Sequence, residues 1–447
     1  MNKKLGYISL GCSKNLVDTE KMLGILTNAG FELTEDLSEA HVIIINTCTF
    51  IDPAKDESIQ TLLEAAEYKK TGCCERLVAA GCLTQQYKRA LSKEIPEIDI
   101  FIGTDSWQDI LDAIVESYQQ NGKKIFRFDT APCEHEELVP RQSLTPEYSA
   151  YVKIAEGCNN GCTFCYIPYV RGAMHSRPIG SVVREVKALT AVGVKEINLI
   201  AQDLSCYGRD LKDGTNLCKL LKELVKIDKI KWIRLFYLYP TYFTDELLDL
   251  ITKEAKICKY VDIPLQHISD NVLQRMRRQD TAESIRLLLY KLKQAQPKIT
   301  VRTTLMVGFP GETDSDFEEL CEFIKEIRFD DLGAFMYSPQ DGTPAAHMPN
   351  QVPESVKEER YHKLMAIQAK ISEENDRALI GTTTEVLIEE ILKDKKGFVQ
   401  AKGRAIFQAP EVDGNIYVEG SKDILPGDFI KVRITDGYAY DLIGEKI

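Results

Sequence analysis

Three apolar runs near the start of the chain each end at a cysteine, and this pattern constrains the fold more than any other feature. The runs 4–12, 40–48 and 75–82 end at Cys12, Cys48 and Cys82, and a fourth apolar run covers 98–105. Helical patterns separate the runs, an alternation typical of a parallel sheet with right-handed crossovers. Because the carboxyl ends of parallel strands lie along one edge of a sheet, we expect the three thiols to converge there. The alternative is that they are ordinary buried cysteines.

The middle of the chain repeats the alternation in a second unit. A polar, proline-containing stretch at 131–145 is expected to be a linker. Six strand-like runs follow, at 150–158, 194–203, 232–240, 259–267, 300–310 and 331–339. Six β/α units predict a partial barrel, with functional groups at the carboxyl ends of its strands. A long helical pattern at 354–380 closes this unit.

The C-terminal residues change character. Short β-type runs at 382–393, 397–407, 414–420 and 428–445 are split by Gly, Pro and Asp, which predicts a small, OB-like antiparallel barrel of about five strands. The expected fold is therefore α/β with a terminal β-barrel. We expect domains at 1–130, 146–376 and 377–447, with the linker at 131–145.

Composition narrows the class of protein. The 447 residues show no secretory signal and no run of the ~18 apolar residues that a membrane span needs, so we expect a soluble, cytoplasmic protein with no membrane partner. The 13 cysteines are an odd number and too dilute for a disulfide scaffold, which in a reducing compartment favours metal ligands or catalytic thiols. The net charge of −12 argues against wholesale nucleic-acid binding.

A second cysteine set lies just after the first strand of the central unit. In "EGCNNGCTFCYIP", Cys158, Cys162 and Cys165 fall within eight residues. Three thiols are too many for one disulfide and too few for a closed zinc site, although His175 is an alternative fourth ligand. A cubane iron–sulfur cluster on three thiolates leaves one iron open to a substrate or cofactor. The missing fourth partner is therefore expected to lie outside the protein.

This motif, Cys-x-x-x-Cys-x-aromatic-Cys after the first strand of a partial barrel, resembles that of radical S-adenosylmethionine enzymes. In that superfamily the open iron binds S-adenosylmethionine, and one electron cleaves it to a deoxyadenosyl radical that abstracts hydrogen. By this resemblance Phe164 is expected to pack beside the adenine; the alternative is an ordinary core aromatic.

The resemblance becomes more specific over nearly the whole chain. "SLGCSKNLVDTE", "INTCTF", "AAGC", "GFPGET" and "YSPQDGTPAA" are similar to segments of the methylthiotransferase family, transferases with a second three-cysteine cluster and a terminal TRAM domain. The resemblance implies two 4Fe-4S clusters, one on Cys12, Cys48 and Cys82 and one on Cys158, Cys162 and Cys165. It also implies S-adenosylmethionine as methyl donor and radical source, an electron donor and a sulfur source. A non-catalytic metal-binding protein that docks on the ribosome is a distant alternative, which two open coordination sites disfavour.

The family modifies either an adenosine in transfer RNA or an aspartate of small ribosomal subunit protein 12. "RLFYLYP", "VDIPLQH" and "QAPEVDG" resemble the protein-modifying branch. Residues 381–447 hold 12 acidic and 9 basic residues, a net charge of −3, which suits a basic ribosomal protein better than RNA. The resemblance thus implies methylthiolation of an aspartate β-carbon, with transfer-RNA modification as the alternative and RNA contact not favoured.

Further candidates for cofactor binding lie on the central strands. Gln202 and Asp203 end the second strand, where they are placed to touch S-adenosylmethionine. Lys153, Arg234 and Arg302 lie on strands and are expected to point into the barrel, toward a carboxylate of the cofactor or target; solvated strand-edge charge is the alternative. His267, after the fourth strand, is either functional or an ordinary hydrogen-bonded histidine. The sequence identifies no catalytic residue.

Overall fold

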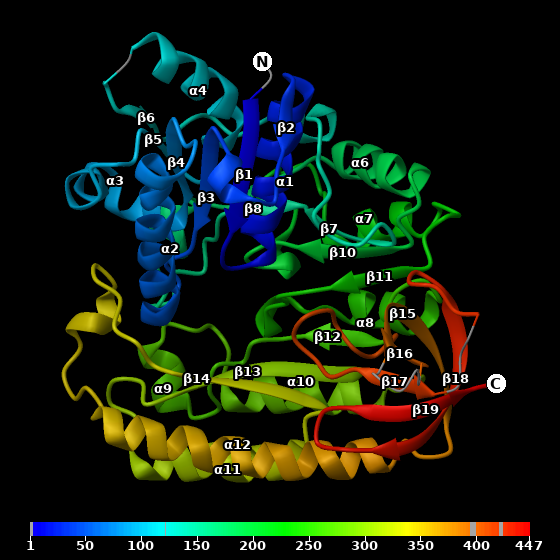
Figure 1. Ribbon diagram of the computed structural model, residues 1–447. Coiled ribbons are helices and arrows are strands. Elements are labelled where there is room, and N and C mark those ends of the chain that lie inside the picture. Colours follow the sequence, from blue (N-terminus) through cyan, green and yellow to red (C-terminus); the bar gives the residue numbers. More distant parts are fainter. Residues whose placement is uncertain (1–2, 121, 394–398, 420–422) are drawn as a thin grey trace.

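The computed structural model describes residues 3–120, 122–393, 399–419 and 423–447, which form three packed units (Figure 1). The N-terminal unit lies against the central one, and the C-terminal barrel lies beside the strands of the central unit (Figure 1). Within the described ranges, no helix combines the length and the apolar character needed to cross a membrane.

The N-terminal unit is a six-stranded sheet in which every neighbouring pair is parallel. In spatial order its strands are β2 (Phe31–Leu33), β1 (Lys3–Ser9), β3 (Val42–Thr47), β4 (Arg76–Gly81), β5 (Ile100–Ile102) and β6 (Ile125–Arg127). Helices α1 (Ser13–Asn28) and α4 (Ile110–Gln119) pack on one face, and α2 (Asp52–Thr71) and α3 (Cys82–Glu94) on the other. The four predicted strands are present. The sequence did not predict β2 and β6, because each is a three-residue strand that contains a charged residue and lies in no longer apolar run, whereas the equally short β5 lies in the run 98–105.

The central unit contains the six predicted strands in two parallel sheets of three. The first consists of β7 (Ser149–Lys153), β10 (Glu196–Ile200) and β11 (Trp232–Leu235), and the second of β12 (Tyr260–Asp262), β13 (Thr300–Val307) and β14 (Asp331–Met336). One parallel bridge, Ile233 to Ile257, lies between them. The outer face is covered by α6 (Ile179–Ala191), α7 (Leu217–Leu224), α8 (Asp245–Lys253), α10 (Ala282–Gln294), α11 (Asp314–Ile327) and α12 (Glu354–Arg377). Short elements complete it: β8 (Ala155–Glu156), β9 (His175–Ser176), α5 (Ile167–Val170) and α9 (Asp270–Arg275).

The C-terminal unit is a closed five-stranded barrel. Its order is β15 (Thr383–Lys393), β16 (Val399–Ala405), β17 (Ile416–Glu419), β19 (Leu442–Lys446) and β18 (Phe429–Gly437), and β18 pairs with β15 to close the ring. The predicted antiparallel barrel needs one correction, because β17 and β19 run parallel. A ring with an odd number of strands cannot alternate direction throughout, so one pair must be parallel. Residues 397–398 and 420 of the predicted β-type runs lie outside the described residues.

Successive side chains of a strand point to opposite faces of the sheet, and this decides which residues of the central strands face the C-terminal barrel. On β11, Ile233 and Leu235 belong to the core under the helices, whereas Trp232 packs edge-on against Phe429 of the barrel. The buried Glu196 accepts hydrogen bonds from Arg234 and, at 2.8 Å, from Arg404 of the barrel. The barrel is therefore joined to the inner face of the central unit by aromatic packing and buried ion pairs.

Candidate active site

The three N-terminal cysteines converge as predicted, since β1, β3 and β4 are neighbours in the sheet. Cys12 caps the start of α1, Cys48 directly follows β3, and Cys82 is the first residue of α3. Gly11 has a left-handed φ of +86°, and a Cβ at this position would lie 2.7 Å from the Cβ of Cys48 and 2.8 Å from its sulfur. Only glycine therefore allows Cys12 and Cys48 to approach in this way.

The side chain of Asn15 connects the turns that carry these thiols. Its Nδ2 donates to the carbonyls of Leu10 and Thr47, each at 2.9 Å, and its Oδ1 lies 3.7 Å from the sulfur of Cys82. All three turns therefore contact one buried amide, and this fixes their relative positions.

Nearby charges and burial give the thiols of Cys12 and Cys82 different pKa values. Burial opposes ionisation of Cys12, but the charges of Lys14 and Arg171 hold the pKa of its thiol below the ordinary value. Burial raises the pKa of Cys82 to about 12, against the effect of Arg171. Arg171 belongs to the central unit, so a cation from the other domain acts on this site.

The second cysteine set lies on one loop between β8 and α5. Gly157 and Gly161 have φ of +76° and +66°, which lets the loop turn back on itself. Thr163 anchors it to the region after α9, because its N–H donates to the carbonyl of Met276 and its hydroxyl to that of Arg275. Burial raises the pKa of Cys158 to about 11 and that of Cys165 to about 12. Such thiols stay protonated until a metal centre takes the proton's place.

The first group of predicted cofactor contacts surrounds this loop. The ring of Phe164 packs edge-on against Phe309 of "GFPGET", with centroids 6.3 Å apart. Asp203 accepts a 2.7 Å hydrogen bond from Asn160 in the loop and caps the short helix at 204–206. Gln202 donates to Glu156. Phe164 thus packs within a small aromatic cluster, and Asp203 braces the thiol loop.

The second group consists of the three predicted cations. Their side chains point to the inner face of the sheets, opposite to the neighbouring strand residues that form the core under the helices. Each is paired with carboxylates of the protein. Lys153 donates to Asp18 at 2.6 Å and to Glu156 at 2.7 Å. Arg234 pairs with Glu196, and Arg302 pairs with Asp262 at 3.0 Å and with Asp413 of the barrel. None of the three is a solvated edge charge, and all three join domains or strands.

His267 is buried, and its Nδ1 accepts the N–H of Ser269 at 3.0 Å. Its Nε2 lies 3.8 Å from the carboxylate of Glu312. Burial lowers the pKa of His267 to about 3, so its imidazole is neutral at ordinary pH. It therefore lies beside Glu312 of the turn at "GFPGET", and its Nε2 has no hydrogen-bond partner among the described residues.

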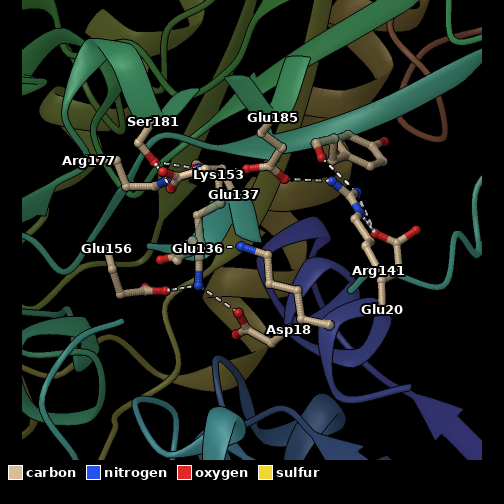
Figure 2. A network of polar contacts seen from close by, with 12 residues as sticks. Asp18, Glu20, Glu136, Glu137, Arg141, Lys153, Glu156, Arg177, Ser181 and Glu185 are labelled. Carbon is tan, nitrogen blue, oxygen red and sulfur yellow. Dashed lines mark hydrogen bonds and ion pairs between the residues drawn. The ribbon is translucent and has the colours of Figure 1, made fainter. Parts of the chain in front are cut away.

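Between the two thiol sites lies a buried polar network that the sequence did not reveal. Lys153 lies between Asp18 and Glu156, and Arg141 of the expected linker lies between Glu20 and Glu185 (Figure 2). The linker therefore forms ion pairs with both the N-terminal and the central domain. No local pattern in the sequence marks such pairs, because the partners are far apart along the chain.

The arrangement fits clusters better than single ions. Among the residues that the structure describes, no group of three or more His, Cys, Asp or Glu side chains is placed to bind one metal ion, and His175 is exposed. The zinc alternative therefore gains no support. In a cubane cluster each thiolate binds a different iron. The three thiols on the glycine-rich loop after β8 suit such a cluster.

Comparison with known proteins agrees with this architecture. The uncharacterized protein family UPF0004 matches residues 4–103, the radical SAM superfamily matches 152–324 and the TRAM domain matches 380–447. The radical S-adenosylmethionine methyltransferase TsrM from Kitasatospora setae, solved with cobalamin and a [4Fe-4S] cluster, has a TM-score of 0.56 at 16% identity over 77% of each chain. The radical enzyme OxsB has a TM-score of 0.54 at 13% identity over 83% of this chain and 56% of its own. These two structures support the fold alone.

The fold and the three-thiol loop define a radical S-adenosylmethionine enzyme. Two relatives are similar over their whole length, and both are named ribosomal protein uS12 methylthiotransferase RimO. The protein of Citrifermentans bemidjiense is 48% identical over 99% of this chain and 98% of its own. That of Geotalea uraniireducens is 49% identical over 100% and 98%. The chain belongs to the RimO family of methylthiotransferases.

Proposed function

We propose that this transferase adds a methylthio group to the β-carbon of an aspartate in ribosomal protein uS12. The observation that carries the proposal is the presence of two three-thiol sites on neighbouring domains, linked by one buried polar network. The names of the full-length relatives support uS12 as the substrate. The net charge of −3 over 381–447 supports a basic protein substrate over RNA.

In this proposal the six cysteines would hold two 4Fe-4S clusters, and the cluster of the radical domain would leave a coordination position for S-adenosylmethionine. When bound, these groups supply the one-electron chemistry and the methylthio group. Cys12, Cys48 and Cys82 are the ligands in the N-terminal domain, and Cys158, Cys162 and Cys165 those in the radical domain. An external electron donor and a sulfur source complete the reaction, which we place in the cytoplasm with the ribosomal protein.

The chain's own residues orient the reactants and exclude water. Thr163 and Asp203 hold the thiol loop from two sides, so its three sulfurs present a fixed set of ligands. Phe164 and Gln202 are the contacts we assign to the cofactor side of this loop. Proximity is the protein's main contribution, because a transfer between two centres depends steeply on their separation and orientation.

The assignment of Lys153, Arg234 and Arg302 to cofactor binding changes in light of their partners. Each already pairs with one or more protein carboxylates, so we propose that they position domains rather than bind a ligand. Arg234 and Arg302 join the central unit to the barrel, and Lys153 joins it to α1. The corresponding domains are 1–130, 146–376 and 377–447, with the linker at 131–145.

The proposal is tested by giving anaerobically reconstituted protein S-adenosylmethionine, a reductant and a sulfur source, with ribosomes and transfer RNA in parallel. Mass spectrometry then searches both for a methylthio group. We expect a gain of one methylthio group on a single uS12 peptide and unchanged RNA. A gain on adenosine would instead identify a transfer-RNA enzyme. Iron in the protein without deoxyadenosine formation would identify a metal-binding protein that does not turn over.

A further inference from the structure

Arg171 connects the two thiol sites more directly than any predicted residue does. It directly follows α5, six residues after Cys165, and its N–H donates to the carbonyl of Ile167 at 2.8 Å. The next carbonyl, that of Gly172, accepts the N–H of Cys158 at 3.2 Å. The backbone of Arg171 is therefore fixed to the loop that carries the radical-domain thiols.

Its side chain lies in the other thiol site. One guanidinium nitrogen donates to Glu156 at 2.9 Å and to Asp18 of α1 at 3.3 Å. The other donates to Oδ1 of Asn15, the amide that contacts all three cysteine-bearing turns. The side chain is only 3% exposed, so its charge is buried where the domains meet.

The charges around Arg171 explain why a cation is needed there. Asp18 and Glu156 each contact both Lys153 and Arg171, so two carboxylates offset two cations. Lys14 is a further cation beside Cys12 and is buried under the ring of Tyr237. Asp105 lies within electrostatic range of the same groups. Three thiolates added to this site would be strongly disfavoured without the cations, because buried charge requires compensation.

We propose that Arg171, a residue of the radical domain, is a positioning residue that supplies part of the counter-charge for the N-terminal thiolates. The negative charge of these thiolates is then fully compensated only when the two domains are docked. The inference rests on the proposed function. It assigns to one residue the link between the radical site and the sulfur-carrying site.

The test compares Arg171→Gln, which removes the charge, with Arg171→Lys, which keeps the charge but loses the planar set of donors. Arg141→Gln is the matched control. Arg141 is also a largely buried arginine that pairs with two carboxylates of different domains, Glu20 and Glu185, and it has no contact with Asn15. Circular dichroism first confirms that each full-length variant is folded.

The first readout is the iron bound per chain after anaerobic reconstitution of the N-terminal site alone, in full-length protein with Cys158, Cys162 and Cys165 replaced by Ala. Arg171→Gln should bind several-fold less iron, because three buried thiolates then lack one of their counter-charges. Arg171→Lys should lie between Arg171→Gln and the unchanged protein, and Arg141→Gln should bind the unchanged amount.

The second readout is the midpoint potential of the N-terminal cluster, measured by EPR titration in full-length protein with Cys158, Cys162 and Cys165 replaced by Ala. Loss of a nearby cation disfavours the added electron, so Arg171→Gln should lower the potential. A tenfold change in this one-electron equilibrium is about 59 mV.

The inference is overturned if Arg171→Gln matches the unchanged protein in both readouts. It is equally overturned if Arg141→Gln, with Arg171 unchanged and the variant folded, produces the same changes, because the effect would then not require the charge of Arg171 itself. Neither result depends on uS12. Failure of the proposed function would appear separately, as absence of methylthiolation by the unchanged protein.

Discussion

The two thiol sites of this molecule have the same number of cysteines but are built in opposite ways. The radical-domain site is local, since its three thiols lie on one loop between β8 and α5. In the N-terminal site the thiols follow three different strands, from Cys12 to Cys82. A cation of another domain, Arg171, contacts this site through Asn15. A local site depends on the geometry of one loop, whereas a dispersed site depends on the sheet and on domain docking.

The largest effect expected from this difference is a separation of two activities. Cys162→Ala should abolish both deoxyadenosine formation and methylthio transfer, because it removes a ligand of the radical site. Cys48→Ala should abolish transfer but keep deoxyadenosine formation. Chromatography of deoxyadenosine and mass spectrometry of the product measure both. Cys73→Ala, at an exposed position outside both sites, is the control and should keep both activities. Methylthio transfer by Cys48→Ala would contradict the division of roles.

The next largest effect concerns domain docking. Arg141→Gln leaves the fully buried side chain of Glu20 without its cation, which should lower the free energy of unfolding by about 3–5 kcal/mol. Urea denaturation measures this loss. Arg433→Gln breaks an exposed pair with Glu445 in the barrel and should cost less than about 1 kcal/mol. Equal losses in the two variants would show that the linker does not hold the domains together.

A smaller effect is the acid sensitivity of the radical domain. The pKa of His267 is about 3 in the folded protein, below its ordinary value of about 6.5, so the neutral form is the one that favours folding. This stability is complete above about pH 6.5 and falls as the pH drops toward 3, by about 2 kcal/mol at pH 5.

His267→Gln should therefore flatten the dependence of the urea midpoint on pH between 7.5 and 5. His175→Gln, at an exposed position of the same domain, should keep the dependence of the unchanged protein. If the urea midpoint of His267→Gln depends on pH as steeply as that of the unchanged protein, protonation of another group causes the loss of stability.

The smallest effect is a difference between two glycines, each beside a cysteine of one site. Gly161→Ala should cost about 1 kcal/mol from the left-handed backbone alone, because no atom lies within 4 Å of its added Cβ. Gly11→Ala adds a collision with Cys48 and should cost about 1 kcal/mol more. Thermal unfolding compares the two, and iron content should fall more in Gly11→Ala. Equal behaviour would show that the N-terminal site tolerates rearrangement.

Local patterns were sufficient for the thiols and for most helices and strands, with β2 and β6 as exceptions. The predicted closing helix at 354–380 is present as α12, and five of the six central strands lie within the predicted runs, while β7 begins one residue earlier, at Ser149. Cys12, Cys48 and Cys82 converge because parallel strands present their carboxyl ends at one edge. The predicted five-stranded barrel is confirmed, and only the expectation that all its pairs are antiparallel was wrong, because closure of an odd ring is a property of the whole barrel rather than of any strand.

The partners of the buried charged residues could not be predicted from the sequence. Periodicity along the chain was enough to predict most of the strands and the places of the six cysteines after them, since periodicity depends on near neighbours, and the cysteine motifs carried the family resemblance. The tertiary structure alone decided that Lys153 and Arg302 pair with protein carboxylates, and that Arg171 binds Asn15 across 156 residues of chain. A buried ion pair forms wherever the fold brings two charges together and excludes water, and no pattern of neighbouring residues records that event.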